Sequence, residues 1–153
     1  MGVLSEVELD ARHEIELHSY VLKIQIESRV CGDLAVNHII PAAINYQNRL
    51  LENVRGLKDV LGADRAPKAS AVQVELIEGI SEHLGKLKSL TDAMTEARKK
   101  ANTIEDHRGK AIAYCDQVKP FLDEIRYHSD KLEITIDDEL WPLPKLRELL
   151  FTR

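Results

Sequence analysis

Aromatic residues are scarce in this sequence, and their scarcity limits the kind of core that it can build. Phe, Trp and Tyr make up only 5% of the 153 residues, whereas hydrophobic residues as a whole make up 44%. The core must therefore consist of Leu, Ile, Val and Ala, which suits packed helices better than a β-sandwich. The charged fraction of 31% is typical of folded proteins rather than disordered ones.

Cysteine is nearly absent, and Cys31 and Cys115 lack the spacing of a metal site or a redox motif. Both fall at apolar positions of helical patterns, so we expect two small buried side chains rather than a redox centre. No hydrophobic run approaches the roughly 20 residues that cross a bilayer, and the first residues do not resemble a signal peptide. We therefore expect a cytoplasmic protein that has no membrane partner.

Positive charge is also in deficit, because the formal net charge is −5. Proteins that bind nucleic acids usually carry a basic face, so this balance argues against a nucleic-acid partner. The densest basic cluster, Arg98 to Lys100, lies at an expected helix end, where the helix dipole favours cations. We interpret that cluster as structural rather than as a phosphate-binding site.

The residue patterns of common catalytic and metal sites are missing too. A di-iron helical bundle needs Glu-x-x-His pairs on two helices, and the sequence contains no such pair. It also contains no Gly-x-Ser-x-Gly turn and no glycine-rich phosphate loop. The acidic run from Asp137 to Glu139 lacks the turned loop of a cation site and indicates a solvated helix end. We expect no catalytic, cofactor-binding or metal-binding residue in this chain.

Helical periodicity is what the sequence does contain. Ser5 and Glu8 predict a capping box, and apolar residues then recur at helical spacing in a first segment that runs to about Leu61. These residues are Val7, Ala11, Ile15, Leu22, Ile26 and Val30, and beyond Pro41 they are Ile44, Leu50, Leu51, Val54 and Leu57. Because proline removes a hydrogen bond and clashes with the preceding turn, we expect a kink or short break at residues 37–41.

The length of this first segment leaves two alternatives. A helix rises about 1.5 Å per residue, so an unbroken segment would extend on the order of 85 Å, much longer than a compact domain. Either the chain folds back at Pro41, or part of the segment projects from the bundle. A projecting part would carry apolar residues that need a partner.

Two further helices follow a predicted loop at residues 62–68, where Gly, Asp and Pro occur together. The second helix should begin near Ser70, and Thr103 with Asp106 predicts a capping box that puts its end at residues 101–103. Its heptad-like seam is Ile77, Ile80, Leu84, Leu87, Thr91, Met94, Arg98 and Ala101. The third helix should bend at Pro120, and its seam is Ala111, Cys115, Val118, Leu122, Ile125, Leu132 and Ile136.

The last residues, 139–153, differ from everything before them. Pro142 and Pro144 favour an extended tail before a final helical turn. The candidate interaction residues on this tail are Trp141, Leu143, Leu146, Leu149, Leu150 and Phe151. They should pack either on the bundle or on a partner. The sequence thus predicts an all-α antiparallel bundle of three to four long helices over residues 1–138, kinked near Pro41, with an extended tail over residues 139–153.

Several strings resemble the C-terminal helical region of type III glutamine synthetases, the large bacterial form. They are WPLPKLRELLF at 141–151, IESRV at 26–30, GDLAVNHIIP at 32–41, YQNRLLENVRGLK at 46–58, EARKKAN at 96–102 and PFLDEIRYHSDKL at 120–132. The resemblance covers nearly the whole chain and is weakest at residues 62–70.

This resemblance implies a parent enzyme that joins ammonia to glutamate with ATP and a divalent metal, within a large ring-based oligomer. It also implies that the chain is the C-terminal piece of a longer protein, because the family's metal-binding glutamates and ATP-binding segment lie on a β-rich catalytic domain that is missing here. The string from Lys119 to Phe121 is similar to part of an ATP site but lacks the glycines that should follow. We therefore expect no cofactor in this chain itself.

Two functions remain open at this point. The first is a non-catalytic structural or oligomer-assembly module, whose partners are the catalytic domain of the parent enzyme and neighbouring subunits. The alternative is a regulatory module that binds a small effector or an adaptor protein. A buried polar cluster around the Pro41 kink would favour the alternative, and its candidate residues are Asn37, His38, Asn45, Gln47, Asn48 and Arg49.

Overall fold

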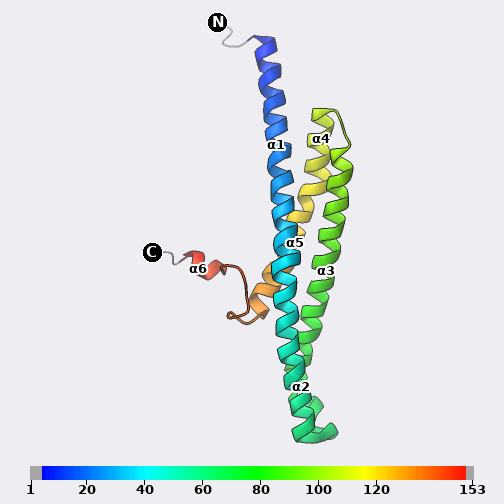
Figure 1. The fold of residues 1–153 in the computed structure, drawn as a ribbon, viewed down its shortest axis with the longest axis vertical. Coiled ribbons are helices and arrows are strands. Elements are labelled where there is room, and N and C mark those ends of the chain that lie inside the picture. The colour runs from blue at the N-terminus through cyan, green and yellow to red at the C-terminus, as the bar shows by residue number, and fades with distance from the viewer. Residues whose placement is uncertain (1–4, 151–153) are drawn as a thin grey trace.

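The computed structural model describes residues 5–150, which form an elongated antiparallel helical bundle (Figure 1). α1 (Glu6–Leu34), the π-helical segment η1 (Ala35–Ile39) and α2 (Ile40–Ala69) form the first arm, and α3 (Ala71–Asn102) returns beside it. The third arm consists of α4 (His107–Ala113), the π-helical segment η2 (Tyr114–Val118) and α5 (Lys119–Thr135). The short helix α6 (Leu146–Leu150) ends the described chain. The prediction of an all-α bundle is confirmed, and the described residues contain no strand.

The capping box at the start of α1 forms as predicted. The Ser5 hydroxyl accepts a hydrogen bond from the backbone N–H of Glu8 at 3.3 Å, and the Glu8 carboxylate accepts one from the backbone N–H of Ser5 at 2.8 Å. The Ser5 hydroxyl also donates to the Glu8 carboxylate at 3.0 Å. The bonds from the Ser5 backbone N–H and from its hydroxyl lower the pKa of Glu8, because they stabilise its charged form. Two orphan donors at the helix start are thereby satisfied.

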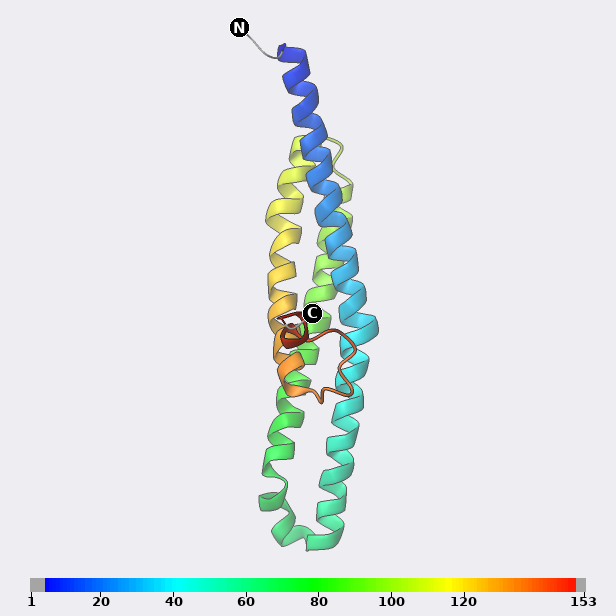
Figure 2. The same cartoon turned by 90° about the vertical axis from the view of Figure 1, so that its left-hand side faces the viewer.

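Pro41 and Pro120 each follow a π-helical segment. Pro41 lies two residues after η1 ends at Ile39, and Pro120 lies two residues after η2 ends at Val118. The wider π turn shifts the carbonyl that the proline ring would otherwise strike. The chain therefore does not fold back at Pro41, and α1 and α2 form one continuous rod. The first turns of α1 project beyond the other helices (Figure 2).

The connection between α2 and α3 differs from the loop predicted at residues 62–68. Only Gly62 leaves the helical conformation there, with a φ of 75°, and the residues after it are helical again to Ala69. Glycine adopts a positive φ without the steric penalty of a side chain. The Gly, Asp and Pro composition suggested a longer loop, but the change of direction is made at Gly62 and at the turn residue Ser70, with helix between them.

The boundary between α3 and α4 is where it was predicted, but the capping box is wrong. Asp106 is the N-cap of α4, and its carboxylate accepts a hydrogen bond from the backbone N–H of Gly109. Thr103 instead donates its hydroxyl hydrogen to the carbonyl of Lys100 at 2.8 Å. The two residues therefore serve different helices, since Thr103 satisfies the end of α3 and Asp106 the start of α4.

The core runs between the three arms along the predicted seams of α3 and the third arm. The buried seam residues include Ile80, Leu87, Thr91, Met94, Ala101, Ala111, Val118, Ile125, Leu132 and Ile136. Cys31 is half-buried and Cys115 is exposed, so the expectation of two buried cysteines is wrong for Cys115. Cys115 lies in the π-helical segment η2, where the widened turn changes which side chains face inward.

The apolar residues noted along α1 face outward instead of inward, whereas Leu50 in α2 packs partly against the core. Val7, Ile15, Leu22, Ile26 and Val30 are between 47% and 78% exposed. The residues that α1 buries are Val21, Ile24 and Ser28, with Leu17 and Tyr20 packed partly beside them. This helix therefore carries two apolar stripes, and the residues picked from the sequence pattern belong to the outer, exposed one.

Candidate functional site

The C-terminal tail is held on the bundle by Lys145, which is 9% exposed. Its ammonium group donates hydrogen bonds to the backbone carbonyls of Glu133 at 2.8 Å and Ile136 at 3.3 Å. Both carbonyls lie at the end of α5, where the helix dipole attracts cations. Lys145 thus caps the C-terminal end of α5 and fixes the point at which α6 begins.

Ion pairs draw the residues after α5 back toward the bundle. Lys145 and Arg147 both donate to the carboxylate of Asp138. Both bonds lower the pKa of Asp138, and the bond from Lys145 has the larger effect. Arg49 of α2 approaches Asp137, with 3.6 Å between its guanidinium and the carboxylate. The tail is therefore tied to both α5 and α2.

The structure divides the six candidate interaction residues of the tail. Trp141 is 8% exposed and packs with the core, and Leu143 is partly buried against it. Leu149 and Leu150 are 58% and 72% exposed on α6, which stands to one side of the rod in Figure 1. Phe151 and the side chain of Leu146 lie outside the described residues. The tail thus consists of a packed part and a displayed part.

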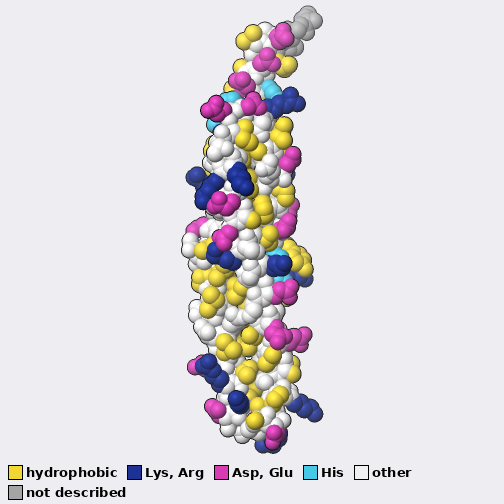
Figure 3. All heavy atoms as spheres, turned by 90° about the vertical axis from the view of Figure 1, so that its right-hand side faces the viewer, with side chains coloured by type: hydrophobic (Ala, Val, Ile, Leu, Met, Phe, Trp, Pro, Cys, Tyr) yellow, Lys and Arg dark blue, Asp and Glu magenta, His cyan; other side chains and the backbone are white. Residues whose placement is uncertain are grey.

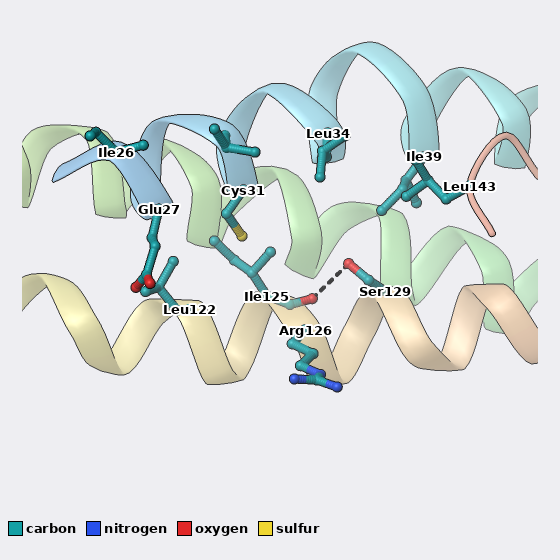
Figure 4. Close-up of a pocket in the computed structure, with 11 residues that line it drawn as sticks. Ile26, Glu27, Cys31, Leu34, Ile39, Leu122, Ile125, Arg126, Ser129 and Leu143 are labelled. Carbon is teal, nitrogen blue, oxygen red and sulfur yellow. Dashed lines mark hydrogen bonds between the residues drawn. The ribbon is translucent and has the colours of Figure 1, made fainter. Parts of the chain in front are cut away.

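An apolar groove of about 510 Å³ lies between α1 and α5, beside the tail. Its lining residues are Ile26, Glu27, Val30, Cys31, Leu34, Ile39, Leu122, Ile125, Arg126, Ser129 and Leu143. Figure 4 shows Cys31 and Leu34 pointing from α1 toward α5, whereas Arg126 turns away. Burial raises the pKa of the Cys31 thiol, so it stays protonated near neutral pH and is a poor nucleophile. The groove is suited to apolar packing rather than to bond-making chemistry.

The polar residues around Pro41 do not form a buried cluster. Asn45, Asn48 and Arg49 are exposed and line a polar depression of about 550 Å³. Gln47 points elsewhere, and its amide donates to the carbonyl of Ile77 at 3.0 Å and to the Ser81 hydroxyl at 2.7 Å. These bonds join α2 to α3, so the role of Gln47 in this fold is structural.

Two histidines that look scattered in the sequence lie in contact in the fold. Nδ1 of His83 on α3 is 2.9 Å from Nδ1 of His128 on α5. One nitrogen must donate and the other accept, so at least one of the two rings is neutral. Burial, and then the charge of His83, lowers the pKa of His128. The two positions are 45 residues apart and share no motif, so sequence reasoning missed the pair.

The same pair should make the bundle less stable in mild acid. The folded-state pKa of His128 lies below its ordinary value of 6.5. Its contribution to stability is therefore complete above pH 6.5 and is lost as the pH falls through the lowered pKa. The thermal unfolding midpoint, followed by circular dichroism, should decline from about pH 7 to about pH 5. His128→Gln should flatten this decline, and the exposed control His38→Gln should not; equal declines in all three proteins would contradict the expectation.

Metal-ligand clusters and membrane-spanning helices are both absent from the described residues. No group of three or more His, Cys, Asp or Glu side chains there is placed to hold a metal ion. No helix in residues 5–150 is both long and apolar enough to cross a membrane. Apolar surface is exposed in the groove, on α6 and on the outer side of α1.

Comparisons with known proteins match the chain along its whole length. A family model described as the glutamine synthetase C-terminal domain matches residues 1–58. A glutamine synthetase of Bacteroides fragilis (strain YCH46) is 52% identical over 151 residues, and a type-3 glutamine synthetase of Dictyostelium discoideum is 27% identical over 152 residues. A glutamine synthetase of Butyrivibrio fibrisolvens is 22% identical over 151 residues. Each alignment covers 99% of this chain but only 21% of the relative.

Fold and surface together define an elongated all-α helical module. The matches cover the helices, the connections and the tail alike, including the strings in which the resemblance was noted. The chain matches the C-terminal domain model of glutamine synthetases and aligns with about a fifth of several glutamine synthetases, one of them a type-3 enzyme.

Proposed function

We propose that this chain is a non-catalytic helical module of a cytoplasmic glutamate–ammonia ligase, and that it serves the structure and assembly of that enzyme. Its relatives are named glutamine synthetases and extend well beyond the region that the chain matches. ATP, the divalent metal and the ligase reaction then belong to the part of the enzyme outside this chain. The partners of the module are the catalytic domain and neighbouring subunits.

The observation that carries this proposal is the anchored tail with its displayed end. Lys145 and Trp141 are buried against the bundle, whereas Leu149 and Leu150 are mostly exposed a few residues later. The anchor holds α6 beside the rod, so little further ordering is needed when α6 meets another surface. Apolar side chains on a fixed support fit a contact with a second folded domain.

The proposal is tested in the full-length enzyme with the substitutions Leu149→Ser and Leu150→Ser made together. The matched control is Ile134→Ser, because Ile134 is an aliphatic residue of α5 that is 81% exposed. Light scattering should show a smaller or less stable assembly for the α6 variant alone. The rate of glutamine formation per intact assembly should equal that of the wild type.

Two results would count against the proposed function. A normal assembly mass in the α6 variant would show that α6 makes no contact that assembly needs. Lost glutamine formation in a fully assembled α6 variant would show that the module takes part in the reaction itself.

A further inference from the structure

Helix α1 is apolar on two opposite sides. The inner side includes Val21 and Ile24, which are 9% and 3% exposed and pack in the core. The other side carries an outer stripe, which we define as Ala11, Ile15, Leu22, Ile26 and Val30. A helix that is apolar all round is normally covered all round.

The outer stripe is continuous enough to receive another helix. Its members recur at spacings of four or seven residues, which places them along one face of a helix. From Ala11 to Val30 the stripe extends about 28 Å at 1.5 Å per residue. Ile26 and Val30 also line the groove between α1 and α5, so the stripe merges with that apolar hollow. Figure 3 views the rod from the side of α3 and α4, and shows hydrophobic and charged side chains mixed along its length.

We propose that the outer stripe packs against the same stripe of a second copy of this chain, with the two α1 helices antiparallel. This inference rests on the proposed assembly function and names one contact that would serve it. The register sets Ile15 of one copy opposite Ile26 of the other, and Ala11 opposite Val30. Ser19 and Leu22 then face each other near the two-fold axis.

The charges that flank the stripe select the antiparallel arrangement. In that register a two-fold axis brings each edge of α1 against the same edge of the second copy. Glu16 then lies beside Lys23 of the second copy, and Arg12 beside Glu27. All four side chains are exposed. Lys23 and Glu27 already lie 4.0 Å apart within α1, so the pairing would join the second copy's charges to this exposed pair. A parallel two-fold pairing would instead set this edge against the opposite edge of the second α1, so Glu16 and Lys23 would no longer face each other.

The opposite edge of the stripe shows the same complementarity. Glu14 lies beside Arg29 of the second copy, and both side chains are exposed. Just beyond the stripe, Glu8 of one copy would face Asp33 of the other, and these like charges disfavour a longer contact. The charge pattern therefore both selects the direction of the pairing and confines it to residues 11–30.

The first test is sedimentation equilibrium of the 153-residue chain and of two matched variants. The wild type should self-associate at concentrations on the order of tens of micromolar, as a modest helix–helix contact would. Ile26→Lys should weaken the association at least about tenfold, because it buries a charge in the stripe. The control Ile134→Lys, on α5, should associate like the wild type. Circular dichroism confirms that each variant is folded.

The second test is a charge swap that depends on the antiparallel register. Glu16→Lys alone should weaken the association, because the new ammonium group then lies beside Lys23 of the second copy. Adding Lys23→Glu should restore it, since the opposite charges face each other again. A monomeric wild type, an Ile26→Lys variant that associates normally, or a swap that fails to restore association would each overturn this inference. None of these results would bear on the α6 contact, which is measured in the full-length enzyme.

Discussion

Replacing Leu87 by alanine should lower the free energy of unfolding of the bundle by about 2–5 kcal/mol. Leu87 lies in the middle of α3 and is 0% exposed. α3 packs against the first arm on one side and α5 on the other, so the lost methyl groups leave a cavity between helices. The long helices are locked to one another by packing and cannot easily close it.

Urea denaturation followed by circular dichroism measures this change. The matched control is Leu9→Ala, because Leu9 is 59% exposed on the first turns of α1. That substitution should change the free energy of unfolding by less than about 0.5 kcal/mol. If the two leucine variants lost similar stability, Leu87 would not lie in the central core that the structure describes.

Replacing Lys145 by methionine should release the tail from the end of α5. Methionine keeps most of the side-chain volume but leaves the carbonyls of Glu133 and Ile136 without the ammonium donor. A buried polar group left without its partner costs about 1–3 kcal/mol. The tail also packs through Trp141 and Leu143, but the hydrogen bonds of Lys145 join it to the end of α5, so a loss of this size should open the tail locally before the bundle unfolds.

The fluorescence of Trp141 reports this release directly. Trp141 is the one tryptophan of the sequence and is 8% exposed, so its emission should shift to longer wavelength in Lys145→Met. The matched control is Arg147→Met, because the Arg147 side chain is 62% exposed and pairs with the same Asp138. An exposed ion pair contributes about 0–1 kcal/mol, and the control should keep the emission of the wild type. Unchanged emission in Lys145→Met would mean that Lys145 is not the anchor of the tail.

Local sequence signals predicted the helices well wherever one physical cause dominated. Ser5 and Glu8 are three residues apart, and no tertiary contact competes with their reciprocal hydrogen bonds. The α3 seam was predicted because its buried residues follow a 3–4 spacing along the helix. The prolines were predicted to disturb their helices, and each follows a π-helical segment that sequence reasoning did not anticipate.

Signals that depend on tertiary contacts could not be read from the sequence. α1 carries two apolar stripes, and only the position of the other helices decides that Val21 faces inward and Leu22 outward. Lys145 reads as an ordinary charged residue until the tail folds back onto the end of α5. His83 and His128 meet only because α3 and α5 lie in register. The tail residues were identified as candidates for interaction, but the division between packed Trp141 and displayed Leu150 required the fold.

The proposed structural role is tested most directly by the mass of the full-length glutamine synthetase with and without this helical region. Light scattering should show that the enzyme lacking the region forms only smaller species, while its remaining domain still binds ATP. The opposite result, a complete assembly of normal subunit number that has lost glutamine formation, would contradict a structural role and place this region in the reaction.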